Sequence, residues 1–361
     1  MQAIVLAAGV GTRLFPLTSG TPKALLPIAN TPLIDYVVDS IQKVGIKDII
    51  VVTGYMSSTT VEYLEDPEKR FKAEIRFVNA NRYKEGPLYS LLAAERLVKD
   101  QFLLIPADLI LDHRILSKLL ANSRNKDIVY IATSRRSLRT QRTLVLCYNR
   151  SANDNSTILR FWQPGSMSEK WQGDTRTQPS ATVGAIICPS RLFEYIHLVA
   201  EKGSRRVIDA LSEYASRTGL AGCVAVNSQH YWFDVDTIDD MLEANSYILK
   251  RRLAISENKG HLYLEHETSV KVGVKMNSRQ AETARVLGPV LVGEGCTLGE
   301  NSIIGPYVSI QGNCVIGKYA KISNAIILGG SVVDNSARID AAVVRGKEIL
   351  RAGTSRGVKN E

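Results

Sequence analysis

The sequence predicts an α/β fold, in which a doubly wound, mostly parallel sheet is followed by a parallel β-helix. Apolar, strand-like runs alternate with helical patterns over roughly the first 250 residues, and near the end an aliphatic residue recurs every six positions. Alternating strands and helices are typical of a sheet covered by helices on both faces. A fixed short period is typical of stacked coils.

The first expected strand is Ala3–Ala7, which runs into a glycine-containing loop, and Pro32–Val44 has the spacing of an amphipathic helix. Further strands are expected at Asp48–Thr53, Glu74–Val78, Phe102–Ile105, Ile128–Thr133 and Ala181–Cys188, and further helices at Leu88–Val98, Ser190–Ala200, Arg206–Ser216 and Asp236–Arg252. Sheets of this class bind their ligands beyond the carboxyl ends of the strands.

The six-residue repeat predicts that one aliphatic side chain per repeat points into a β-helix. The members are Val292, Leu298, Ile304, Ile310, Ile316, Ile322 and Leu328. The register is expected to slip at Asp334, and Ile339 and Val344 are less regular candidates, so the coils should continue to about residue 345. The predicted organisation is a domain over 1–245, a connector over 246–285 and a β-helix over 286–350.

Composition favours a cytoplasmic protein. The five cysteines are scattered without a CxxC pair, which is typical of reduced, mostly buried thiols. No apolar run is long enough to cross a membrane, and the N-terminus does not resemble a signal peptide. The net charge is +9, but no basic run carries interleaved aromatics, so neither a nucleic acid nor a membrane is expected as a partner.

Chemistry is concentrated in two short segments near the N-terminus. Leu6-Ala7-Ala8-Gly9-Val10-Gly11-Thr12-Arg13 follows the first strand, and Thr21-Pro22-Lys23-Ala24-Leu25-Leu26-Pro27 comes shortly after it. Glycines allow backbone N–H groups to approach phosphates, and fixed Arg and Lys donors stabilise a departing pyrophosphate. Each residue alone has a plainer interpretation: Arg13 as a surface ion pair and Lys23 as a surface lysine.

These paired segments resemble the sugar-phosphate nucleotidylyltransferases over roughly residues 1–245. The resemblance implies a Rossmann-like nucleotidyltransferase domain, and a left-handed hexapeptide β-helix is common among relatives. It also implies that Mg²⁺ assists transfer of a nucleoside monophosphate from a nucleoside triphosphate to a sugar or polyol phosphate, with release of pyrophosphate.

The resemblance assigns roles to particular residues. Leu6, Ala7, Ala8, Gly9, Gly11, Thr12 and Arg13 match the nucleotide loop, and Lys23 matches its phosphate-contacting lysine. Asp108 and Asp234 match the metal-binding aspartates, with Asp236 as the alternative to Asp234. Carboxylates together with substrate phosphates are the ligands that Mg²⁺ prefers. Taken alone, Asp108 has the plainer interpretation of a helix N-cap, and Asp234 that of a turn residue.

Substrate recognition is expected at Gly86, in a segment resembling the family's base-binding strand end, and at Gly184 and Asp234 on the acceptor side. The family's E-K-P lysine is absent, because Phe161-Trp162-Gln163-Pro164 stands there. The possible substitutes are Lys170, Arg135, Arg136, Arg139 and Arg142. The Asp234-Val235-Asp236-Thr237 ending resembles that of the inositol-phosphate cytidylyltransferases more than that of the thymidylyltransferases, and this resemblance favours CTP or an unusual acceptor.

The β-helix is expected to serve in assembly or regulation, with a homo-oligomer formed through its coils. An acyltransferase site is a weaker alternative, since the last histidine, His266, precedes the repeats and such sites use a histidine base. The rival from another class is a non-catalytic regulatory subunit of the same architecture.

Overall fold

A computed structural model describes residues 1–66, 71–134, 144–148, 156–162, 177–227, 229–255, 262–264 and 284–353 of the chain. Residue contacts divide it into two compact units. The first comprises Met1–Val10, Thr21–Ala24 and Ile34–Asp234, and the second comprises Gly11–Gly20, Leu25–Leu33 and Val235–Glu361. Two short segments from the N-terminal region therefore share a unit with the C-terminal coils.

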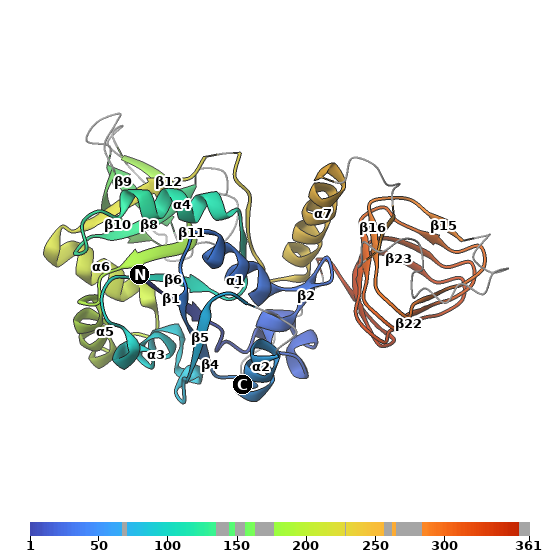
Figure 1. Cartoon of the computed structure of the whole chain (residues 1–361), viewed down its shortest axis with the longest axis horizontal. Helices are drawn as coiled ribbons and strands as arrows, with labels where there is room; N and C mark the ends of the chain where they lie inside the picture. Colours follow the sequence, from blue (N-terminus) through green and yellow to red (C-terminus); the bar gives the residue numbers. More distant parts are fainter. Residues whose placement is uncertain are drawn as a thin grey trace. The chain divides into compact units, whose positions relative to one another are not determined.

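A nine-stranded sheet forms the centre of the first unit (Figure 1). In spatial order its strands are β5 (Glu74–Asn79), β4 (Asp48–Thr53), β1 (Gln2–Leu6), β6 (Phe102–Pro106), β11 (Thr177–Cys188), β8 (Val129–Ser134), β12 (Ala221–Ala225), β10 (Ser156–Trp162) and β9 (Leu144–Tyr148). Strand β1 is parallel to β4 and β6, whereas β11 is antiparallel to β6 and β8. The sheet is therefore mixed, with a parallel half that begins at the N-terminal strand.

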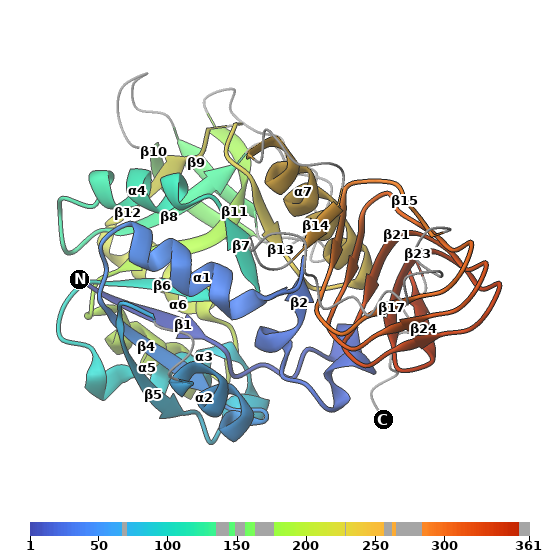
Figure 2. The same cartoon turned by 45° about the vertical axis from the view of Figure 1, so that its right-hand side comes forward.

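Helices cover both faces of this sheet, which explains why its central strands are continuous apolar runs. The helices of this unit are α1 (Leu33–Lys43), α2 (Ser57–Glu65), α3 (Pro87–Leu92), α4 (His113–Asn122), α5 (Leu192–Glu201) and α6 (Val207–Thr218). The first residue of α1, Leu33, is grouped with the second unit. One buried core joins α3, α5 and α6 to strand residues such as Ile4, Ile50 and Leu104. Helix α4 packs against β8, β11 and β12, and Figure 2 shows the helices around the sheet.

A small antiparallel ribbon accompanies the sheet. It consists of β7 (Leu109–Leu111) and β13 (Trp232–Asp234), with Asp234 in register with Leu109. The ribbon joins segments more than a hundred residues apart in the sequence.

The second unit contains the coils, visible at the C-terminal end of the chain in Figure 1. Their strands are β14 (Leu262–Leu264), β15 (Arg285–Val286), β16 (Val290–Val292), β17 (Thr297–Leu298), β18 (Ile303–Ile304), β19 (Val308–Ile310), β20 (Val315–Ile316), β21 (Lys321–Ile327), β22 (Val332–Val333), β23 (Arg338–Arg345) and β24 (Glu348–Arg351). Successive coils pair in parallel, as Val290 does with Val308, and β24 runs antiparallel to β23. This arrangement confirms the β-helix that the repeat predicted.

The expected register of the coils is wrong in its last part. The sequence predicted Leu328 as the inward residue, but Ile327 pairs with Ile310 and belongs to the core of the coils. The slip therefore occurs before Asp334. Between Ile322 and Ala325 the corner has two residues, whereas three separate Ile304 from Val308 in the previous coil.

Helix α7 (Ile238–Ile255) and a hairpin formed by β2 (Pro27–Ile28) and β3 (Thr31–Pro32) complete the second unit. The helix packs against β2 and against the coil strands β19, β21 and β23. No helix in the described ranges is both long and apolar enough to span a membrane.

Three of the cysteines, Cys188, Cys296 and Cys314, are buried and form no disulfide. Cys223, however, is disulfide-bonded, so the expectation of reduced thiols is wrong for this residue.

Candidate active site

The carboxyl ends of β1 and β6 define one edge of the sheet in the first unit. The two strands are parallel neighbours with Leu6 in register with Pro106, and the Ala107 N–H donates to the Leu6 carbonyl at 3.0 Å. Strand β1 lies between β4 and β6, so the chain continues from β1 to β4 on one side and to β6 on the other. Ligands of doubly wound sheets bind at such a point, where the strand order changes direction.

A pocket of about 230 Å³ opens at this edge. Its lining includes seven residues expected from the sequence: Leu6, Ala7, Ala8, Gly9, Lys23, Gly86 and Asp108. The structure thus brings the first half of the glycine loop, the lysine, one aspartate and the expected base-binding glycine to one cavity within the first unit.

Other residues that line the pocket were not predicted individually from the sequence. Tyr83, Pro87 and Ser90 also line it. The Tyr83 ring lies so close to Gly54 that a Cβ at Gly54 would meet it at 2.8 Å. Pro87 and Ser90 belong to the segment Glu85–Ser90, which resembles the family's base-recognition segment, whereas the isolated Tyr83 carried no signal.

Gly86 has a conformation that excludes other residues. Its φ is +124°, and an added Cβ would lie 2.6 Å from the Arg205 carbonyl oxygen. The same carbonyl accepts the Leu88 N–H at 3.1 Å, which fixes the start of α3 against the segment before α6. Gly86 therefore allows two backbone segments to meet at the pocket wall.

Lys23 forms an ion pair with Asp108, and both side chains are mostly buried, with 11% and 21% of their surfaces exposed. Coulombic attraction between charges grows as water is removed from around them. Asp108 follows β6, so the pair fixes the lysine ammonium at the end of this strand.

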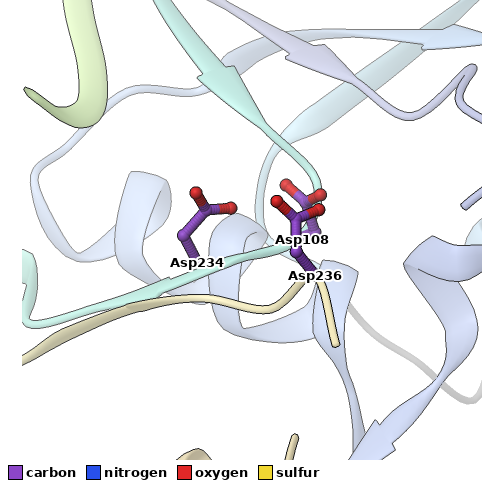
Figure 3. A group of neighbouring side chains, drawn as sticks. All are labelled: Asp108, Asp234 and Asp236. Atoms are coloured by element: carbon purple, nitrogen blue, oxygen red, sulfur yellow. The ribbon is translucent and has the colours of Figure 1, made fainter. Parts of the chain in front are cut away.

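The β7–β13 ribbon brings the second aspartate to the first. Because Asp234 is in register with Leu109, it lies beside the residue that follows Asp108. One carboxylate oxygen of each aspartate lies within 4.8 Å of the other, and Figure 3 shows both side chains at this place. Two oxygen ligands at this spacing fit a single hard divalent cation.

The ribbon is held by Asp112, which is 2% exposed. Its N–H donates to the Tyr231 carbonyl at 3.0 Å, and its carboxylate accepts from the Arg114 N–H and guanidinium. Burial acts to raise the pKa of Asp112, but these hydrogen bonds outweigh it and lower the pKa to about 2. The backbone N–H of Asp112 therefore ties the end of β7 to the residue before β13, while its charged carboxylate holds Arg114.

Gly184 lies on β11 next to the turn that carries Asp108. Its φ is +96°, and a Cβ there would be 3.5 Å from Leu109 and 3.7 Å from Pro106. The expected acceptor residue thus belongs to the same part of the first unit as the two aspartates.

Gly11, Thr12, Arg13 and Asp236 belong to the second unit. Gly11 has φ +70° and precedes a 3-10 turn over Thr12–Leu14. Arg13 donates to the Asp236 carboxylate at 2.8 Å, with 69% of the arginine side chain and 29% of the aspartate side chain exposed. The ion pair considered for Arg13 is therefore present, and its partner is the residue expected as the alternative to Asp234.

The acceptor-side candidates Lys170, Arg135, Arg136, Arg139 and Arg142 lie outside the described residues. The same is true of Gln163 and Pro164, which replace part of the E-K-P motif.

Comparison with known proteins places these features in a family. Residues 3–230 match the MobA-like NTP transferase domain, and residues 286–353 match the GMPPB C-terminal domain. The first match covers more than half of the chain. The chain therefore belongs to the MobA-like NTP transferase family and is a nucleotidyltransferase, as the sequence predicted.

Similar proteins span nearly the whole chain. Glucose-1-phosphate thymidylyltransferase of Streptomyces griseus is 24% identical over 95% of this chain and 92% of its own length. The bifunctional sugar-1-phosphate nucleotidylyltransferase/acetyltransferase of Sulfurisphaera tokodaii is 27% identical over 98% of this chain and 82% of its own. UTP–glucose-1-phosphate uridylyltransferase of Synechocystis sp. is 24% identical over 96% and 88%.

A solved structure has the same fold. The putative glucose-1-phosphate thymidylyltransferase of Bacillus anthracis, crystallised with sucrose, superposes with a TM-score of 0.56 at 22% identity. The match covers 72% of this chain and 98% of that one. It supports the α/β fold described above.

Proposed function

We propose that this protein is a Mg²⁺-dependent sugar-1-phosphate nucleotidylyltransferase, which converts a nucleoside triphosphate and a sugar-1-phosphate into a nucleoside-diphosphate sugar and pyrophosphate. The observation that carries the proposal is the pocket at the ends of β1 and β6. There the glycine loop, Lys23 and Asp108 line one cavity, and Asp234 lies beside Asp108.

Asp108 and Asp234 are the proposed metal ligands, and Asp236 is the alternative to Asp234. The donor set fits Mg²⁺, which prefers a few carboxylate oxygens and completes its coordination with water and substrate phosphates. When bound, the ion would neutralise negative charge on the triphosphate during transfer.

The triphosphate is proposed to bind along Leu6–Gly9 and the residues that follow on the chain. Backbone N–H groups of Gly9, Gly11 and Thr12 would donate to phosphate oxygens, and Lys23 and Arg13 would stabilise the charge that develops on pyrophosphate. In the structure each cation is paired with an aspartate, Lys23 with Asp108 and Arg13 with Asp236. Phosphate oxygens would take over part of these pairings.

The proposed reaction is an in-line displacement at the α-phosphorus. A phosphate oxygen of the acceptor forms the new P–O bond, the bond to the bridging oxygen of the β-phosphate breaks, and pyrophosphate departs with the bonding electrons. Positioning and charge neutralisation account for the rate in such transfers, so no side-chain nucleophile is required.

The substrates are proposed at the level of class. Gly86 is proposed to receive the base, and Gly184 and Asp234 the acceptor. CTP remains a candidate from the Asp234–Thr237 ending, and the names of the relatives add dTTP and UTP, so a pyrimidine triphosphate is the first choice. Glucose-1-phosphate is the first acceptor to test, followed by other sugar phosphates and polyol phosphates.

Location, assembly and domain bounds are also proposed. We propose a cytoplasmic location and a homo-oligomer formed through the β-helix. We further propose a catalytic domain over 1–245, a connector over 246–285 and a β-helix over 286–350. The absence of Lys, Arg and aromatic clusters of the nucleic-acid-binding kind supports small-molecule substrates.

Pyrophosphate release tests the proposal. The purified protein is incubated with Mg²⁺, each nucleoside triphosphate and each member of a sugar- and polyol-phosphate panel. We expect release with one pair, and at least a ~100-fold lower rate for Asp108→Ala, the size of effect seen when a group that stabilises transferred charge is removed. Asp100→Ala is the matched control, because Asp100 is an exposed acid paired with Lys126.

Other outcomes identify the rivals. Nucleotide binding without release with any pair, from folded protein, would favour a non-catalytic regulatory subunit. Consumption of an acyl-coenzyme A by the same preparation would reveal an acyltransferase site in the β-helix.

A further inference from the structure

The loop that continues the pocket-lining segment Leu6–Gly9 belongs structurally to the β-helix unit. Gly11–Gly20 and Leu25–Leu33 share a compact unit with residues from Val235 onward, whereas Thr21–Ala24 between them belongs to the other unit. Lys23 is therefore carried by a short stretch whose two flanking segments are held by the C-terminal part of the chain.

Arg345, the last residue of β23, makes the contacts that hold the first flanking segment. Its Nη1 donates to the Pro16 carbonyl at 2.8 Å, to the Ser19 hydroxyl at 3.1 Å and to the Leu17 carbonyl at 3.3 Å. One guanidinium thus joins three residues of the loop to the last complete coil.

The lack of a side chain at Gly20 leaves room for this guanidinium. A Cβ at Gly20 would lie 2.8 Å from Arg345 Nη2, closer than non-bonded atoms approach. The absence of a side chain at Gly20 leaves the space that the guanidinium occupies beside the loop.

The backbone of Arg345 is itself fixed by the coil. Arg345 pairs with Glu348 across the β23–β24 hairpin. The next residue, Gly346, donates its N–H to the Ser331 hydroxyl at 2.9 Å and accepts the Val332 N–H at 2.9 Å. These contacts fix the backbone from which the guanidinium extends.

Inside the loop, hydrogen bonds connect the Arg345 contacts to the phosphate-binding end. The Thr18 hydroxyl, which is buried, donates to the Gly11 carbonyl at 3.1 Å. The same carbonyl accepts the Leu14 N–H at 2.9 Å and begins the turn that carries Arg13. A shift at Leu17 or Ser19 would therefore move Gly11 and Arg13 as well.

The second flanking segment is held in the same way by α7. Asn245, fully buried, accepts the Ala29 N–H at 2.9 Å and the Ser309 hydroxyl at 2.8 Å through the same Oδ1. Arg252 donates to the Ala29 carbonyl at 2.9 Å and to the Thr31 hydroxyl at 2.9 Å. The hairpin after Lys23 is thus joined both to α7 and to a coil strand.

We infer that Arg345 is a positioning residue for the nucleotide loop: it holds Gly11–Gly20 in the conformation that binds the triphosphate. The inference rests on the proposed function for its effect on turnover. It differs from the role in assembly expected from the sequence, because it requires no second copy of the chain.

The test compares Arg345→Ala and Arg345→Lys with Arg338→Ala, an exposed arginine at the other end of the same strand. Hydrogen exchange of peptides covering residues 11–20 is measured first, because it needs no substrate. We expect faster exchange for Arg345→Ala than for wild type, partial recovery for Arg345→Lys and no change for Arg338→Ala.

Binding and turnover are measured next, with the triphosphate that supports most pyrophosphate release or, if none does, with ATP, CTP, GTP, UTP and dTTP in turn. Arg345→Ala should weaken triphosphate binding and lower kcat/KM by at least about tenfold, with the larger part in KM for the nucleotide. Millimolar guanidinium should restore part of the loss in Arg345→Ala and none in Arg13→Ala.

Gly20→Ala offers an independent approach, because the added methyl group would displace the guanidinium although Arg345 itself is unchanged. This variant should show the same faster hydrogen exchange of residues 11–20 as Arg345→Ala. Unchanged exchange of the loop in Arg345→Ala would overturn the inference, as would faster exchange with unaltered nucleotide affinity. A wild-type protein that binds the triphosphate but never releases pyrophosphate would refute the proposed function alone, and the exchange and affinity results would still decide the role of Arg345.

Discussion

Gly86 illustrates how a single residue connects backbone geometry with the proposed choice of base. The sequence located it through a motif, but its physical requirement became clear only from the Arg205 carbonyl 2.6 Å from its would-be Cβ. Arg205 is distant in sequence and carries no motif, so no pattern could have predicted the contact.

Gly86→Ala should therefore raise the KM for the nucleotide by at least about tenfold, which corresponds to about 1.4 kcal/mol, because the pocket wall must move to accept the methyl group. Steady-state kinetics with varied nucleotide measures this. Gly203→Ala is the matched control: Gly203 also has a positive φ, +82°, but no atom lies within 4 Å of the added Cβ. An unaltered KM in Gly86→Ala would remove Gly86 from the base site.

Asp112 contributes stability that depends on pH. Its folded pKa of about 2 lies below the ordinary aspartate value of 3.8, so the contribution is present above about pH 4 and is lost as the pH falls through 2. We expect Asp112→Asn to be about 2 kcal/mol less stable than wild type at pH 5, and the difference to shrink by about half at pH 3.

Urea unfolding at these two pH values measures the effect. Arg114 pairs with Asp112, and His113 and His230 face it at 3.8 Å and 3.6 Å. A difference that is the same at pH 5 and pH 3 would contradict the assignment.

At the scale of elements, the strands and helices of the first unit were predictable because burial on both faces leaves apolar runs with clear ends. The expected strand Asp48–Thr53 coincides with β4. The expected helix Leu88–Val98 is instead divided into α3 and a 3-10 turn at Glu95–Leu97. The β7–β13 ribbon was not predicted, because three-residue strands carry almost no periodicity.

The β-helix register shows where periodicity fails. Ile326, Ile327 and Leu328 are all aliphatic, so the sequence offers no sign of which one points inward once a corner loses a residue. The left-handed φ values mark the change, since they fall at Asn313 and Tyr319 and then, five residues later, at Asn324.

This register makes a prediction for two adjacent valines of β22. Val333 belongs to the core of the coils and Val332 is 38% exposed. Val333→Ala should destabilise the protein by about 1–3 kcal/mol, the cost of removing buried methyl groups, whereas Val332→Ala should change stability by less than about 0.5 kcal/mol. Chemical denaturation of the two variants decides it, and equal effects would mean that the register is misplaced.

At the scale of the whole molecule, chain order and structural units differ. From the sequence, residues 11–33 were predicted to belong to the N-terminal domain. An apolar pattern carries no information about which distant residues a loop contacts. The structure instead groups most of that stretch with α7 and the coils, through contacts such as those of Arg345 and Asn245. Long-range hydrogen bonds from single polar side chains are the part of a fold that sequence patterns predict least.

The central claim is that the pocket at the ends of β1 and β6 transfers a nucleoside monophosphate. The most direct measurement uses a triphosphate labelled at the α-phosphate, with Mg²⁺ and the acceptor panel, and follows the label into a product that resists phosphatase. We expect one labelled nucleoside-diphosphate sugar, formed in equal amount to pyrophosphate and lost in Asp108→Ala and Asp234→Ala. A folded protein that binds the triphosphate but transfers no label, or transfers it equally well without both aspartates, would refute the transferase activity proposed for this pocket.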